Sequence, residues 1–144
     1  MSAFTYPAKF STGSDGRVLV EFVDLPRGAT DGKNLSEAME EAIDALGSDL
    51  SIRLSQHEEI PTPSPAKRGQ RLVLVPPRAA IKLSINQAMR EQSVTQVQLG
   101  ERLGIDAKQV RRILDLDHES KLSQLEAALA ALGLMASVAI TAVA

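Results

Sequence analysis

The side chains in this sequence that are best suited to recognising a partner are basic and polar, and they lie within five consecutive positions. They are Lys108, Gln109, Arg111 and Arg112. Arg and Lys donate hydrogen bonds to phosphate oxygens and to the major-groove edge of guanine, and Gln pairs with the edge of adenine. The pattern predicts contact with duplex DNA if one helix presents these side chains on its open face.

Two short helices joined by a tight turn would position these side chains. Leu99 and Leu103 lie four residues apart and predict the first helix, which Gly104 can end in a left-handed conformation. Asp106 can then accept hydrogen bonds from the first backbone N–H groups of the second helix. The apolar residues of the second helix recur at helical spacing and are expected to face inward: Val110, Ile113 and Leu114. A helix-turn-helix over residues 95–115 is therefore predicted.

The first of these helices offers further contacts. Thr95 and Gln96 are expected at its N-terminus, where backbone N–H groups and the helix dipole favour a phosphate. Gly100 is expected to let the second helix approach closely. The alternative is a helical bundle that binds no nucleic acid, and it is favoured by the acidic residues after the second helix: Asp115, Asp117 and Glu119. DNA binding is preferred because the capped turn, inward apolar spacing and outward basic residues agree.

Composition limits the classes of partner and of chemistry. Aromatic residues make up 3% of the 144 positions, so the stacking platforms of single-strand binders are not expected. The sequence has no Cys, which excludes disulfides, thiolate metal sites and thiol nucleophiles and fits a reducing cytoplasm. No signal peptide or membrane span is recognisable. A cytoplasmic protein without membrane association is expected.

Charge is distributed unevenly along the chain. Residues 1–60 carry 5 Lys and Arg against 11 Asp and Glu, whereas residues 61–144 carry 11 against 7. An acidic front half and a basic back half predict two different partners. A basic protein suits the front half and nucleic acid suits the back half.

The front half has the pattern of a small sheet covered by one helix. Alternating residues on both sides of a Gly-containing turn predict a β-hairpin from residues 6–10 and 18–22, and one short strand has room to follow. Asn34 is expected to cap a long helix, with Glu37 closing a capping box. The face of this helix opposite its apolar stripe is acidic: Glu37, Glu40, Glu41 and Asp44.

Prolines organise the middle of the chain. A Pro-rich connection spans about residues 55–70 and is expected to be extended, and residues 72–75 predict a strand that is either buried on both faces or joined to the hairpin sheet. The pair Pro76-Pro77 is expected to separate a first domain, residues 1–76, from a second, residues 77–144. The fold class predicted is α+β: a β-β-(β)-α-β domain, then an all-α helix-turn-helix domain with a terminal β-strand. The last helix is expected to be capped by Ser123 with Glu126.

The terminal strand is predicted from the alternation in residues 137–143. Val138, Ile140 and Ala142 would share one face. An apolar strand without a neighbour to pair with is a liability, so pairing with the same strand of a second copy is expected. The resulting homodimer, or higher even oligomer, would have the two-fold symmetry that a palindromic operator requires. The alternative is that this segment packs against its own domain.

Several short motifs occur in a defined order along the chain. They are Tyr6-Pro7-Ala8, Val20-Glu21-Phe22-Val23-Asp24-Leu25-Pro26, Thr30-Asp31-Gly32, Ser36-Glu37-Ala38 and Ile60-Pro61-Thr62-Pro63-Ser64-Pro65. Together with the helix-turn-helix, their order resembles the HicB family of bacterial antitoxins. The resemblance implies that the front domain is a partial RNase H-like fold that binds a HicA-like toxin, a small basic mRNA interferase. It also implies that the back domain binds double-stranded operator DNA and represses the toxin-antitoxin operon.

The resemblance further implies that Asp24 and Leu25 lie near the toxin, in addition to the acidic helix face. Two other functions stay open: a stand-alone helix-turn-helix repressor whose N-terminal domain senses a small ligand, and an enzyme. A metal-dependent nuclease needs converging carboxylates, for which only Asp24 and Glu37 are candidates. His57 and His118 lack a second ligand or a nucleophile at useful spacing. No catalytic site, no metal and no cofactor are therefore expected.

Overall fold

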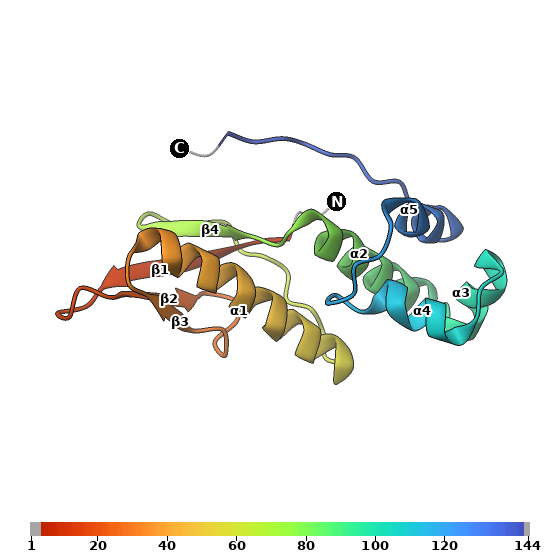
Figure 1. Ribbon diagram of the computed structural model, residues 1–144, viewed down its shortest axis with the longest axis horizontal. Helices are drawn as coiled ribbons and strands as arrows, with labels where there is room; N and C mark the ends of the chain where they lie inside the picture. Colours follow the sequence, from red (N-terminus) through yellow and green to blue (C-terminus); the bar gives the residue numbers. More distant parts are fainter. Residues whose placement is uncertain (1–3, 143–144) are drawn as a thin grey trace. The chain divides into compact units, whose positions relative to one another are not determined.

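The computed structural model describes residues 4–142, and the chain divides into two compact units, Met1–Ala80 and Ile81–Ala144. The first unit is a four-stranded antiparallel sheet with one helix packed on it (Figure 1). Its strands lie in the order β3-β2-β1-β4. The elements of this unit are β1 (Thr5–Thr12), β2 (Val18–Phe22), β3 (Thr30–Gly32), α1 (Leu35–Ser55) and β4 (Gln70–Leu74). The predicted order of hairpin, short strand, helix and closing strand is confirmed.

The inner face of the sheet and the apolar stripe of α1 form the core of the first unit. On the sheet, Tyr6 lies opposite Val73, and Ala8 lies opposite Phe22. Side chains alternate between the two faces of a strand, so these residues point toward the helix. The core residues with no exposed surface include Tyr6, Ala8, Val20, Val73, Ala38, Ala42, Leu46 and Leu50. The hydrophobic patterning of the sequence therefore determines which face α1 covers.

Helix α1 begins where the sequence predicts. The side chain of Asn34 accepts a hydrogen bond from the Glu37 backbone N–H at 2.9 Å. The Glu37 carboxylate accepts from the backbone N–H of Lys33, one residue before the cap, and not from Asn34, so the predicted capping box does not form. Strand β3 passes very close to this helix start, because a Cβ atom on Gly32 would lie 2.3 Å from the backbone nitrogen of Ala38. Only glycine fits at this position of β3.

Side-chain hydrogen bonds fix the Pro-rich connection between α1 and β4. The Tyr6 hydroxyl donates to the Pro61 carbonyl oxygen at 2.7 Å. The Asp24 carboxylate accepts from both the backbone N–H and the hydroxyl of Ser64, at 2.9 and 2.6 Å. Prolines provide no N–H of their own, so these contacts from distant residues tie the segment to the unit.

We expect the stability of the first unit to depend on the ionisation of Tyr6 at alkaline pH. Burial, and to a smaller extent the charge of Asp24, raises the pKa of Tyr6 from 10.0 to about 12. Between these values the unfolded chain loses the phenolic proton while the folded chain keeps it, so the stability contribution is present below pH 10 and lost as the pH rises toward 12. The free energy of unfolding should fall by about 2–3 kcal/mol across this window.

Urea unfolding at a series of alkaline pH values would measure this fall. Tyr6 is the only tyrosine, so its ultraviolet absorbance reports its ionisation directly. Tyr6→Phe should remove the pH-dependent fall that belongs to this group. An equally steep fall in Tyr6→Phe would show that other groups cause it.

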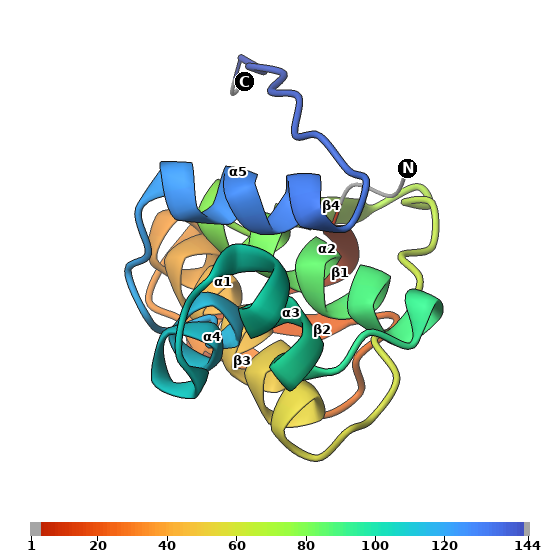
Figure 2. The ribbon, with the colours of Figure 1, turned by 90° about the vertical axis from the view of Figure 1, so that its right-hand side faces the viewer.

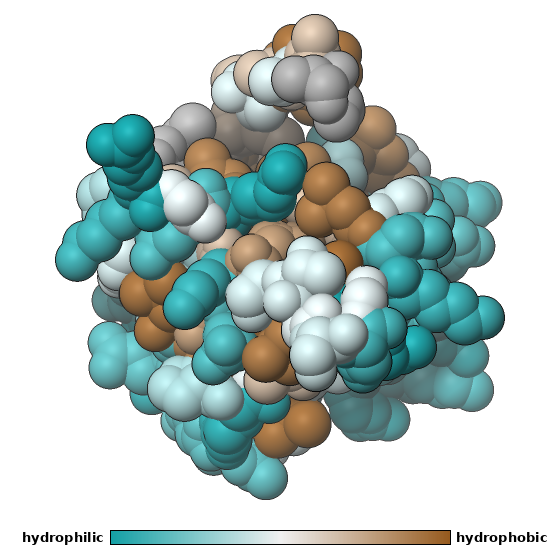
Figure 3. All heavy atoms as spheres, turned by 90° about the vertical axis from the view of Figure 1, so that its left-hand side faces the viewer, coloured by the Kyte–Doolittle hydropathy of each residue, from teal (hydrophilic) through white to brown (hydrophobic). Residues whose placement is uncertain are grey.

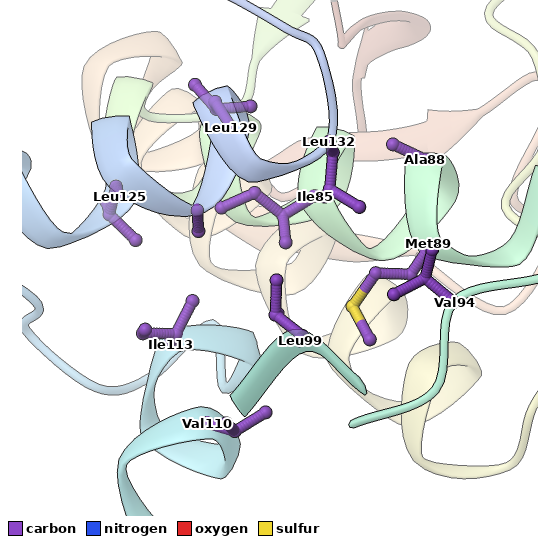
Figure 4. Close-up of a cluster of buried hydrophobic side chains, with 11 residues drawn as sticks. Ile85, Ala88, Met89, Val94, Leu99, Val110, Ile113, Leu125, Leu129 and Leu132 are labelled. Carbon is purple, nitrogen blue, oxygen red and sulfur yellow. The ribbon is translucent and has the colours of Figure 1, made fainter. Parts of the chain in front are cut away.

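The second unit is a small all-helical fold. Its helices are α2 (Pro77–Gln92), which begins just before the division between the units, α3 (Gln96–Leu103), α4 (Ala107–Leu114) and α5 (Leu122–Ala131). Helix α3 packs against both α4 and α5, and Figure 2 shows α5 lying across the short helices. Apolar side chains from all four helices meet in one core (Figure 4), which includes Ile85, Met89, Leu99, Val110, Ile113, Leu125, Leu129 and Leu132. This core fixes the rotation of α4.

The cap predicted for the last helix is wrong, and the predicted terminal strand does not form within one copy of the chain. Helix α5 begins at Leu122 after Lys121, and no side chain caps it, so Ser123 is not the N-cap. Residues 137–142, where a strand was expected, lie in neither a helix nor a strand and are exposed; residues 143 and 144 lie outside the described part. A strand requires hydrogen bonds to a neighbouring strand, and the sheet of the first unit does not include this segment.

Candidate functional site

The helices α3 and α4 are joined by a tight, capped turn. The Thr95 hydroxyl oxygen accepts from the Gln98 backbone N–H at 3.1 Å, and the Gln98 side chain accepts from Thr95 in return at 2.9 Å. Gly104 ends α3 in the left-handed conformation, with φ 66°. Asp106 caps α4 by accepting from the Gln109 backbone N–H at 2.8 Å. The predicted roles of Gly104 and Asp106 are confirmed.

Gly100 allows α4 to approach α3 closely. A Cβ atom at this position would lie 3.0 Å from the carbonyl oxygen of Ile105 and 3.3 Å from a methyl carbon of Val110. Val110 and Ile113 are buried on the inner face of α4. The close approach that the sequence predicts is confirmed, and it leaves the opposite face of α4 open to solvent.

The open face of α4 carries an unneutralised basic cluster, formed by Lys108, Arg111 and Arg112. All three residues are exposed, and Arg111 and Arg112 lie three and four positions after Lys108, which makes each of them its neighbour on the helix surface. Within residues 4–142 none of them forms an ion pair with an acidic side chain. Like charges at this spacing repel each other, so an anionic partner would stabilise this face.

The polar residues predicted beside this cluster also serve the helix caps. The Gln109 side-chain oxygen accepts from the Asp106 backbone N–H at 3.4 Å, so only its amide N–H groups remain as donors to a partner. The Thr95 hydroxyl is used as an acceptor in the cap of α3 and keeps its hydrogen as a donor. Gln96 is exposed in the first turn of α3. All three can therefore act as hydrogen-bond donors to a phosphate or a base.

The acidic face of α1 is the second candidate surface. Glu40, Glu41 and Asp44 are exposed and lie within two turns of one another. Glu37 belongs to the same face but is half-buried, and its carboxylate accepts from the backbone before the helix. The structure therefore brings three free carboxylates together on α1.

The other two residues predicted to contact a partner have roles inside the first unit. Leu25 has no exposed surface, so its side chain offers nothing to a partner in this conformation. The Asp24 carboxylate is bound to Ser64. The contact between Asp24 and Ser64 joins residues forty positions apart, so sequence spacing does not indicate it.

An apolar surface in the first unit was not anticipated. Leu72 lies opposite Pro7, which is buried, Leu74 lies opposite Thr5, and Leu19 is the outward residue between two buried valines of β2. Leu19, Leu72 and Leu74 are 44%, 52% and 57% exposed. On one side of the molecule, brown apolar side chains lie among teal polar ones (Figure 3). Alternation along β2 places Leu19 on this open face and was the signal that could have found it.

Comparison with known proteins identifies the family. Residues 5–84 match the family model described as "HicB_like antitoxin of bacterial toxin-antitoxin system". This chain belongs to the HicB-like antitoxin family. Antitoxin HicB of Escherichia coli strain K12 is 33% identical over 128 residues, covering 89% of this chain and 93% of the relative. Antitoxin HicB 1 of Photorhabdus laumondii subsp. laumondii is 34% identical, covering 89% and 81%, and antitoxin HicB of Pseudomonas fluorescens strain Pf0-1 is 34% identical, covering 82% of each chain.

The likeness to the HicB relatives includes both units. An alignment of 128 residues is longer than the first unit, so part of α2 to α5 must be aligned as well. The predicted membership of the HicB family is confirmed.

The remaining expectations for this HicB-like chain concern metals, membranes and the chain end. In the part of the chain that the structure describes, no group of three His, Asp or Glu side chains could hold a metal ion. No described helix combines the length and apolar character needed to cross a bilayer. Val138 and Ile140 are 77% and 92% exposed, and Ala142 is exposed too. The predicted dimer residues are thus accessible.

Proposed function

We propose that this HicB-like chain is an antitoxin that neutralises a cognate HicA-like mRNA interferase and also represses its own operon by binding double-stranded operator DNA. Toxin binding is assigned to residues 1–76, and DNA binding with dimerisation to residues 77–144. The basic cluster on α4 carries the DNA-binding part. It supplies three exposed cations on a helix that follows a capped turn, the arrangement of a helix-turn-helix.

The toxin-binding part is supported by the charge of the first unit and by the antitoxin names of the relatives. Glu40, Glu41 and Asp44 form an exposed acidic surface that would steer a basic protein toward α1. The order β-β-β-α-β supports a partial RNase H-like fold. Asp24 and Glu37, the candidate metal ligands, are each used in separate contacts that hold the fold, which favours a binding protein over an enzyme. We place this function in the cytoplasm.

The C-terminal segment supports the proposed dimer. Its exposed apolar residues, Val138 and Ile140, alternate with smaller ones and have no strand to pair with in a single copy. Antiparallel pairing with the same segment of a second copy would satisfy the backbone and bury these side chains. Two second units would then be related by the two-fold symmetry of a palindromic operator.

Alanine substitutions in the basic cluster test the DNA-binding proposal. Arg111→Ala and Arg112→Ala should each weaken operator binding by about 1–3 kcal/mol if the guanidinium groups reach base edges, with toxin neutralisation retained. Gel shifts at one fixed salt concentration, using the DNA upstream of the coding sequence and a scrambled duplex, would measure this. Arg71→Ala removes the same charge from β4 of the first unit and should have little effect. Unchanged affinity in both α4 variants would show that α4 is not the DNA-contacting helix.

A further inference from the structure

A buried lysine ammonium sits at the end of α4. Lys82, on α2, has no exposed surface. Its ammonium group lies within hydrogen-bond distance of four oxygen atoms, three of which are backbone carbonyls. They are the carbonyl oxygens of Arg112 at 2.8 Å, Asp115 at 2.7 Å and His118 at 2.7 Å, and the Ser120 hydroxyl at 2.9 Å. An ammonium has three N–H donors, so these oxygens satisfy it completely.

These contacts cap the C-terminal end of α4. The last carbonyl groups of a helix have no partner within it, and they form the negative end of the helix dipole. Lys82 supplies a positive charge there. Asn86, one turn further along α2, donates from its side-chain nitrogen to the Leu114 carbonyl oxygen at 3.3 Å. Side chains of α2 therefore satisfy the last carbonyl groups of α4, as the backbone N–H of Gly104 does for α3.

The same contacts fix the backbone of a residue in the basic cluster. The carbonyl oxygen of Arg112 accepts a hydrogen bond from the Lys82 ammonium, and the Arg112 side chain is exposed to solvent. We propose that Lys82 is a positioning residue for DNA binding, because it holds the last turn of α4 at the orientation in which Arg112 meets the operator. This inference rests on the proposed DNA-binding function. Burying a charge is costly unless it is fully hydrogen-bonded, and the three carbonyl oxygens and the Ser120 hydroxyl meet that condition for Lys82.

Charge in the following turn adds to this role. Asp115, Asp117 and Glu119 follow α4 directly and would repel phosphate. The Lys82 ammonium contacts the backbone of this acidic turn and supplies an opposing positive charge beside it. In a buried site such a charge is poorly screened by salt. Lys82 therefore also lowers the repulsion between the acidic turn and DNA.

A double-mutant cycle with Arg112 separates positioning from general stabilisation. Lys82→Met keeps the length of the side chain and removes the ammonium. Leu132→Ala is the matched control, because it removes buried surface from the core of the same unit and leaves the contacts of Arg112 intact. Each substitution is made alone and with Arg112→Ala. Affinity for the duplex upstream of the coding sequence is measured under conditions in which circular dichroism shows every variant to be folded.

Lys82→Met should weaken binding about tenfold alone and much less in the Arg112→Ala background, because contacting residues have coupled effects. Leu132→Ala should change affinity by the same factor in both backgrounds. Equal losses for Lys82→Met in both backgrounds would overturn the positioning role. If Lys82→Met does not fold, Lys82→Gln decides in the same cycle, since it removes the charge and keeps a side chain that can donate to the carbonyl oxygens. A folded wild-type chain that does not bind the duplex would refute the proposed DNA-binding function itself.

Discussion

Replacing Gly32 with alanine is expected to unfold the first unit and abolish toxin neutralisation while the second unit still binds operator DNA. The new Cβ atom would lie 2.3 Å from the backbone nitrogen and 2.7 Å from the Cα atom of Ala38. Both are backbone atoms in the first turns of α1, so no side-chain rotation relieves the clash. Overpacking of this kind costs about 3 kcal/mol or more. A small unit has a total stability of only about 5–15 kcal/mol.

Gly47→Ala provides the matched control in the same unit. Gly47 lies within α1, and a Cβ atom there would meet no atom within 4 Å beyond the adjacent backbone of its own helix. Alanine favours a helix over glycine by about 0.8–1 kcal/mol, so this variant should be slightly more stable than the wild type. The same chemical change is therefore predicted to have opposite effects at two positions.

Three measurements decide this prediction: thermal unfolding, co-purification with the toxin encoded by a neighbouring reading frame, and gel shifts with operator DNA. Gly32→Ala should lose the cooperative unfolding transition of the first unit and should no longer co-purify with the toxin. Gly47→Ala should keep both properties. A Gly32→Ala chain with wild-type unfolding and neutralisation would show that β3 and α1 do not pack this closely. Loss of DNA binding along with the toxin would contradict the separation of the two functions.

Most features that depend on residues three or four positions apart were predictable from the sequence, although the cap expected at Ser123 is absent. Asn34 caps α1, Gly104 ends α3 and Asp106 caps α4, because each role is set by the backbone immediately beside it. The exposure of the basic cluster was predictable for the same reason. Val110 and Ile113 take the inner face of α4 and leave the charged residues outside.

Features that depend on distant residues were not predictable in this way. Lys82 lies thirty residues or more from each oxygen that it contacts, and the only sequence signal was a charge on the inward stripe of α2 with Ile85 and Met89. The family resemblance places Leu25 near the toxin, but its side chain is part of the core. The terminal strand is a third case, because alternation shows that a segment can form a strand but does not supply its partner.

Truncation after residue 136 is expected to convert the dimer to a monomer and to remove most of the operator affinity. Residues 137–142 are exposed and unpaired in the single copy, so the proposed strand pairing is the contact that the truncation deletes. Once one subunit of a dimer has bound its half-site, the other subunit meets the second half-site at a high effective concentration. Losing this linkage lowers overall affinity by a factor on the order of 10²–10⁴. Light scattering would report the mass, and gel shifts the affinity.

Single substitutions test whether the segment pairs as a strand. In a strand, Ile140 shares one face with Val138, while Thr141 points to the other face. Ile140→Asp should therefore disrupt the dimer, because a buried aspartate without a partner is costly, and Thr141→Asp should leave it largely intact. A dimer that survives truncation would place the interface elsewhere in the second unit. Equal effects of the two substitutions would indicate that the segment mediates assembly without forming a strand, since only a strand gives adjacent residues opposite environments.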